Sequence, residues 1–140
     1  MIYTSYHAVA KENHIGISTS RARYSKVFKY YSQLTPASII GSDWRNLSDE
    51  EYIIRFKKGL ENLNAEKVFN ELKNLAGGGD VVIVCFEKYD KMCHRHIVAD
   101  WISEKLGLEI KELNAPKNYV LNKNTYLYEK KQEESLFWDL

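Results

Sequence analysis

The distribution of apolar residues divides the chain into strand-like segments near the N-terminus, helical segments in the middle and a strand–helix–strand unit after residue 80. Segment 1–7 (MIYTSYH) is rich in Tyr, Ile and Thr, which favour strands, and segment 14–20 (HIGISTS) predicts a second, shorter strand. Between residues 22 and 45 aromatic residues are scattered and Pro36 is the one strong break. This region predicts a loop or irregular helices.

Two amphipathic helices follow. Ser48 with Glu51 three residues later forms a capping box, and Asn64 can cap a second helix that ends at Gly77–Gly79. Apolar residues recur at helical spacing in both, namely Tyr52, Ile53, Phe56, Leu60 and Leu63 in the first and Val68, Phe69, Leu72 and Leu75 in the second.

The segment 80–86 (DVVIVCF) has the continuous apolar run of a strand buried on both faces, as in a parallel sheet. A helix from about Cys93 to Gly107 and a strand in 108–113 (LEIKEL) complete a right-handed crossover. We therefore expect a single-domain, Rossmann-like, three-layer α/β sandwich with a mainly parallel sheet over residues 1–128. Residues 129–140 are expected to form a C-terminal tail or docking segment.

Composition narrows the class of protein. A chain of 140 residues fits one domain, and its formal charge of +1 provides no overall field for nucleic acid or membranes. The start resembles no signal peptide, and no window approaches the roughly 20 apolar residues of a membrane span. Two cysteines without a secretion signal predict a reducing, cytoplasmic location and no membrane partner.

Candidate chemistry gathers in segment 85–102 (CFEKYDKMCHRHIVADWI). Cys85 would lie at the carboxyl end of the buried strand, and Cys93, His94 and Arg95 at the start of the next helix, the edge where α/β sheets bind ligands. A helix N-terminus favours anions and lowers the pKa of a thiol. We expect Cys93 to be a nucleophile or anion ligand, His94 a general acid or base, and Arg95 an anion clamp.

Other residues can complete this site. Glu87 could act as a general base or hold a sugar hydroxyl, and Lys88 could contact an anion. Cys85 could contact the ligand, although its apolar run favours a small buried side chain. If the first two strands adjoin the site, further ligand-binding candidates are Tyr3, Ser5, Tyr6, Ser18, Ser20 and Arg21. Core packing is the alternative role for the tyrosines.

A metal site is a competing hypothesis. Cys85, Cys93 and His96 offer ligands suited to zinc, but their spacing differs from the usual two close pairs of ligands. The sequence therefore predicts neither metal nor cofactor. A disulfide between the cysteines is the least expected arrangement in a cytosolic chain.

The same motifs resemble the domain-of-unknown-function family 488 of bacterial and phage proteins, as far as about residue 113. The matching segments are IYTSY (2–6), ISTSR (17–21), SDEEYIIRF (48–56) and the residues Cys85, Glu87, Lys88, Cys93, His94 and Arg95 of a C-x-E-K…C-H-R signature. Many members have a proline after the SR element, where this chain has Ala22. The resemblance implies the fold and the site, whereas the family has no settled activity.

We therefore expect a small α/β enzyme, or enzyme-like pocket, for an anionic ligand related to nucleotides or nucleobases. The fold-level analogy with other small α/β proteins suspected of handling nucleotides points the same way. The alternative is a non-catalytic nucleotide-binding or protein-docking module, such as a phage accessory or a protein associated with DNA metabolism. The weak net charge disfavours extensive phosphate contacts with nucleic acid.

The C-terminal segment QEESLFWDL places apolar side chains after a polar stretch. It loosely resembles peptides that dock on bacterial sliding clamps, with Gln132, Leu136 and Phe137 at the matching positions. We favour the alternative, in which the tail packs on its own domain or on a second subunit of a homo-oligomer.

Overall fold

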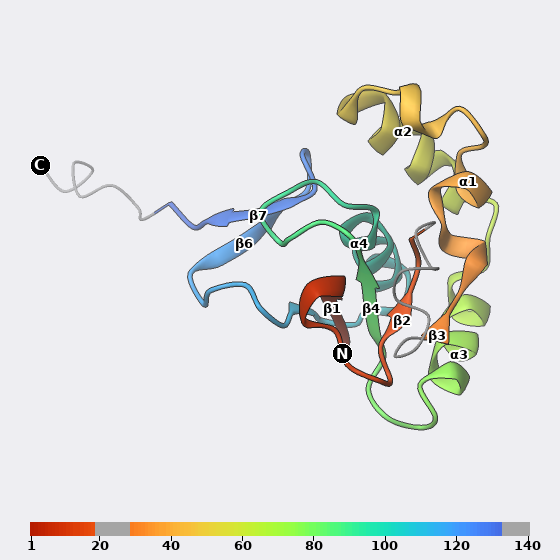
Figure 1. Ribbon diagram of the computed structural model, residues 1–140, viewed down its shortest axis with the longest axis vertical. Coiled ribbons are helices and arrows are strands. Elements are labelled where there is room, and N and C mark those ends of the chain that lie inside the picture. The colour runs from red at the N-terminus through yellow and green to blue at the C-terminus, as the bar shows by residue number, and fades with distance from the viewer. Residues whose placement is uncertain (19–28, 133–140) are drawn as a thin grey trace, which may run out of the picture.

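The computed structural model of the protein describes residues 1–18 and 29–132 (Figure 1). A five-stranded parallel sheet has the order β3-β2-β4-β1-β5. Its strands are β1 (Ile2–Tyr6), β2 (Ile15–Gly16), β3 (Lys29–Tyr30), β4 (Val82–Cys85) and β5 (Ile110–Glu112). The α/β sandwich around a parallel sheet that the sequence predicts is confirmed.

Within the described residues, four α-helices and three short 3₁₀ helices join the strands. They are α1 (Pro36–Ile39), α2 (Asp49–Leu60), α3 (Ala65–Leu75), α4 (His94–Leu106), η1 (His7–Val9), η3 (Ser32–Leu34) and η4 (Trp44–Asn46). Helix α4 packs on β1, β4 and β5, and both α2 and α3 pack on α4 (Figure 1). Helix α4 is therefore enclosed between the sheet and two other helices.

The helix ends follow the predicted capping residues. The Ser48 side chain accepts a hydrogen bond from the Glu51 backbone N–H at 3.2 Å, and Asn64 accepts one from Lys67 at 3.0 Å. Helix α4 ends at Gly107, whose φ of 69° belongs to the left-handed region that glycine adopts without strain. Local chemistry therefore fixes where these helices begin and end.

The enclosure of α4 buries every residue from His94 to Ile102. Its first turns therefore lack the polar face of a surface helix, and charged or polar side chains lie inside the protein. Those side chains belong to His94, Arg95, His96 and Asp100. Because buried polar groups need partners, this end of α4 must carry a polar network.

An antiparallel hairpin extends the fold beyond the predicted strands. Strands β6 (Tyr119–Asn122) and β7 (Leu127–Lys130) form it, so the boundary expected at residue 128 falls inside β7. Tyr126, in the turn, donates a hydrogen bond to Asp100 of α4 at 2.7 Å, which ties the hairpin to the core. The turn is built by the Asn122 side chain, which accepts backbone bonds from the next residues.

Two predicted features fall outside the described residues. They are the end of the second predicted strand, with Ser20 and Arg21, and the apolar C-terminal residues Leu136, Phe137, Trp138 and Leu140. Within the two described ranges, no helix combines the length and apolar character needed to cross a membrane.

Candidate functional site

A pocket of about 400 Å³ opens where β4 ends and α4 begins. We call it the β4–α4 pocket, and its lining residues are Ser18, Pro36, Trp44, Arg45, Leu47, Asp49, Tyr52, Phe86, Glu87, Met92, Cys93 and His94. The carboxyl edge of a parallel sheet is the usual ligand site of α/β proteins. The pocket therefore lies where the sequence predicts a site.

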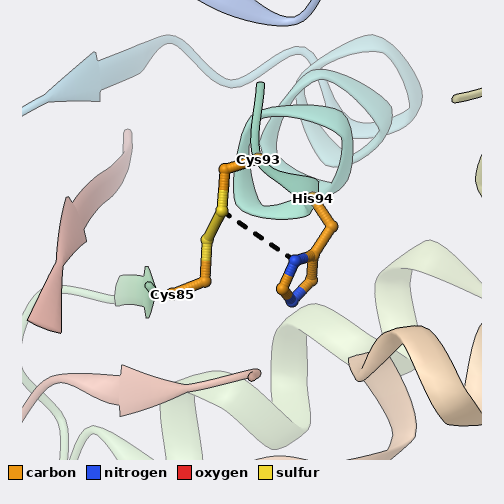
Figure 2. Close-up of side chains that lie close together, drawn as sticks. All are labelled: Cys85, Cys93 and His94. Carbon is orange, nitrogen blue, oxygen red and sulfur yellow. Dashed lines mark hydrogen bonds between the residues drawn. A yellow bond between two sulfur atoms is a disulfide. The ribbon is translucent and has the colours of Figure 1, made fainter. Parts of the chain in front are cut away.

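Cys85, Cys93 and His94 meet beside this pocket (Figure 2). Cys85 is the last residue of β4 and Cys93 is the N-cap of α4, so the loop between them returns the chain to the strand end. A disulfide joins the two cysteines, whose Cα atoms lie 7.1 Å apart. The sequence made a disulfide the least expected arrangement, and the structure differs by joining the two sulfurs, although the Cα separation lies just beyond the usual disulfide range of about 4.4–6.8 Å.

The imidazole of His94 has a defined tautomer. Its Nε2 lies 2.6 Å from the Ile17 carbonyl oxygen, which can only accept, so Nε2 carries the proton. The Nδ1 lone pair then points toward Cys93 Sγ, 3.9 Å away (Figure 2). Burial, together with the nearby positive charge of Arg95, lowers the pKa of His94 to about 4. At neutral pH His94 therefore offers a neutral acceptor nitrogen to the sulfurs.

Arg95 has a different environment from the one predicted. Its guanidinium is fully buried and binds both carboxylate oxygens of Glu112, at 3.0 and 3.1 Å. Its remaining end donates to the Glu87 carbonyl oxygen at 2.5 Å and to Cys85 Sγ at 3.2 Å. An anion-clamp role does not fit this arrangement, because Arg95 is engaged within the core and does not line the pocket.

His96 is separated from the cysteines. Its ring is buried edge-on against Tyr128, with ring centroids 5.1 Å apart, and the Lys91 backbone is its polar neighbour. Two residues along a helix correspond to a rotation of about 200°, so His94 and His96 lie on opposite faces of α4. The histidine grouped with the cysteines is therefore His94 and not His96.

Strand order brings some of the other predicted residues to the site. Because β2 pairs with β4, Ser18 lines the pocket, and its hydroxyl lies 3.0 Å from His7 Nε2. Glu87 lies in the pocket wall, whereas Lys88 is exposed above the Tyr89 ring.

The predicted residues of β1 lie apart from the pocket. Ser5 is buried and accepts a hydrogen bond from Asn114 at 2.9 Å, and Tyr6 is half-buried beside Cys85 in the strand register. Tyr3 lines a separate hollow with His14 and Leu113. None of these three residues contributes to the lining of the β4–α4 pocket.

Sequence reasoning did not find most of the pocket wall. Trp44, Arg45 and Asp49 come from η4 and the start of α2, in or beside a region without clear periodicity. Tyr52 was found only as a core residue of the helix, and Phe86 was found only as the end of a strand. The available signal was the Trp44–Arg45 pair, an aromatic residue and a cation next to each other shortly before the helix cap at Ser48.

The fold and the site define the class of protein, an α/β protein with a buried Cys–Cys–His cluster at the carboxyl edge of a parallel sheet. Residues 3–106 match the family DUF488-N3a, described as the active DUF488-N3 subclade, and the chain belongs to this family. The resemblance predicted from the sequence motifs is thereby confirmed. Comparison with curated proteins and with solved structures gives no match.

The two cysteines are expected to differ in reactivity once the disulfide is reduced. In chelator-treated protein Cys93 should react with iodoacetamide faster than Cys85, because Cys93 lines the pocket beside His94 and Cys85 is fully buried. Peptide mass spectrometry after timed labelling measures both rates. Equal labelling rates would contradict a selectively reactive Cys93.

Proposed function

We propose that the protein is an enzyme that acts on a planar, nucleotide-related ligand in the β4–α4 pocket. The observation that carries this proposal is the neutral His94, whose Nδ1 points at the cysteine sulfurs beside a partly aromatic pocket. A perturbed, buried histidine in a cleft is a common mark of a catalytic site. The description of its family as an active subclade supports a catalytic role.

The pocket walls favour a flat ligand with polar edges. Trp44 and Tyr52 lie edge to face, with ring centroids 6.4 Å apart, and Phe86 lies on the wall formed after β4. Aromatic walls of this kind stack on nucleobases. Arg45, with its guanidinium carbon 4.6 Å from the Trp44 ring centroid, adds a cation for a phosphate or another anionic group.

The reacting groups lie where such a ligand would meet the start of α4. His94 can accept a proton through Nδ1, because its Nε2–H is held by the Ile17 carbonyl. Glu87 can accept a hydrogen bond from a ligand hydroxyl or amine at the pocket wall. Cys93 also lines the pocket, so reduction of the disulfide would add thiol chemistry to the acid–base chemistry of His94.

Replacing Trp44 by alanine is expected to weaken nucleotide binding roughly fivefold to 150-fold, because one base–aromatic stack is worth about 1–3 kcal/mol. Isothermal titration calorimetry with the four common ribonucleoside monophosphates measures the effect. Phe69→Ala is the matched control, since Phe69 lies on α3 and does not line the pocket. Its affinity should equal that of the unmodified protein.

Catalysis is tested separately by incubating the reduced protein with the same nucleotides and separating the products by chromatography. A product that the unmodified protein and the Phe69→Ala variant form, and that the Cys93→Ser variant does not form, supports a catalytic function. If nucleotides bind but none is converted to product, the protein is a non-catalytic nucleotide-binding protein. Absence of binding at about millimolar nucleotide would remove the nucleotide proposal altogether.

A further inference from the structure

We propose that the reduced protein binds one Zn²⁺ ion, or a similar borderline-soft divalent metal ion, through Cys85, Cys93 and His94. This proposal deepens the proposed function, on which its catalytic meaning rests, but metal binding itself requires no nucleotide. In the metal-bound form His94 Nδ1 and the Cys93 sulfur would be ligands, so a metal-bound water would take their place as the reacting group. It also differs from the ligand set suggested by sequence, because His94 replaces His96.

The three donor residues already converge, although the disulfide joins the two sulfurs in this structure and they must separate on reduction before an ion can bind between them. One sulfur from each cysteine and one His94 nitrogen lie within 4.8 Å of one another, and all three residues are buried. Ligands at zinc distances of about 2.0–2.3 Å in a tetrahedral site lie roughly 3.5 Å apart. The Cys93 Sγ to His94 Nδ1 distance of 3.9 Å is close to this value, so an ion requires only a small adjustment between these two donors.

The groups behind the ligands also suit a metal ion. Metal-binding histidines usually donate the other ring N–H to a carbonyl or carboxylate, and His94 Nε2 is held in this way by Ile17. On the other side, Arg95 donates to Cys85 Sγ at 3.2 Å, which stabilises a thiolate ligand. These contacts orient both ligands before any ion binds.

The charges balance in the buried cluster. Two thiols lose their protons when the ion binds, so Zn²⁺ and two thiolates form a neutral unit with the neutral imidazole. The guanidinium of Arg95 is neutralised separately by Glu112, at 3.0 Å. The positive charge of Arg95 is therefore already balanced by Glu112, and it leaves the net charge of the buried metal site unchanged.

The cluster leaves a position for a fourth ligand on the pocket side. Cys93 and His94 line the β4–α4 pocket, whereas Cys85 lies behind them in the core. Three protein ligands with a water or substrate as the fourth are the pattern of catalytic zinc sites, and the Cys₂His donor set occurs among them. A bound water there would be a nucleophile within the proposed pocket, with Glu87 on its wall as proton acceptor.

Metal binding and the disulfide exclude each other, because the ion needs both sulfurs as thiolates. The test therefore uses the full chain reduced under anaerobic conditions, loaded with Zn²⁺ and freed of excess metal. Elemental analysis gives the stoichiometry. Loading with Co²⁺ gives an independent signal, because thiolate ligation produces a sulfur-to-cobalt charge-transfer band and tetrahedral ligation produces intense visible bands.

We expect one metal ion per chain, lost in Cys85→Ser and His94→Gln and retained in His96→Gln. His96 is the matched control because it is also buried in α4 but lies outside the cluster. Circular dichroism identifies variants that remain folded. A reduced wild-type chain that binds no metal would overturn the proposal without any variant. Loss of metal in the folded His96 variant, with retention in the folded His94 variant, would also overturn it.

Neither result for metal depends on nucleotide binding, so the two proposals can fail separately. A metal-free protein that still converts nucleotides leaves the proposed enzyme with sulfur and imidazole chemistry alone. A protein that binds metal but no nucleotide retains the metal site and loses the proposed substrate class.

Discussion

Replacing Arg95 by alanine is expected to lower the free energy of unfolding by about 3–5 kcal/mol, enough to unfold a marginally stable domain. The side chains of Arg95 and Glu112 are both fully buried and are joined by two hydrogen bonds. Glu112 also accepts a hydrogen bond from Thr4 at 2.6 Å. Removing the guanidinium would therefore leave a buried carboxylate without its counter-charge.

Urea denaturation measures this effect, and two further variants show its cause. Arg55→Ala breaks the exposed pair with Asp43 and should lower the stability far less than Arg95→Ala does, because solvent screens exposed charges. Removing both buried charges in Arg95→Met/Glu112→Leu should recover much of the stability, because neither charge is then left unpaired. An Arg95→Ala protein as stable as the wild type would contradict the role of Arg95 in the core.

The Arg95 network also shows where sequence reasoning stopped. Arg95 stands beside two histidines at a helix start, which favours an anion ligand when the partner is unknown. Its partner Glu112 lies 17 residues away in a short strand, and only the pairing of β5 with β1 places it beside α4. A single acidic residue in a strand carries no local sign of burial.

Helices and the edge that carries the site could be predicted because their signals are local. Ser48, Asn64 and Gly107 act within one turn of the chain, and the apolar run before Cys85 identifies a buried parallel strand. The pocket wall depends instead on long-range packing. Trp44 reaches the site through the irregular segment between α1 and α2, and no period identifies it.

The cysteine cluster was predictable in part. Cys85, Cys93 and His94 were found because a strand end and a helix start must meet at the carboxyl edge of the sheet. The direction of each side chain was not available from spacing alone. Two contacts place the histidines. The carbonyl of Ile17, the residue after β2, holds His94 toward the sulfurs, and Tyr128 of the hairpin contacts His96 on the other face of α4.

Acidification is expected to destabilise the metal-free protein below about pH 6.5. Burial lowers the pKa of His7 to about 4, with Arg95 as the second cause, and burial also lowers the pKa of His14. His94 and His96 are shifted in the same direction, mainly by burial. All four histidines of the chain are therefore held neutral by folding.

The sign of the effect follows from proton counting. Between the unfolded value near 6.5 and the folded value near 4, the unfolded chain binds more protons than the folded one, so stability falls as pH falls. Each fully shifted histidine contributes roughly 1.4 kcal/mol per pH unit in this window. Urea denaturation at several pH values from about 7 to about 5 measures the slope, above the range where most carboxylates titrate. His7→Asn should reduce that slope by up to roughly 1.4 kcal/mol per pH unit, which is the contribution of one histidine. A stability that stays constant over this range would contradict the neutral burial of His7.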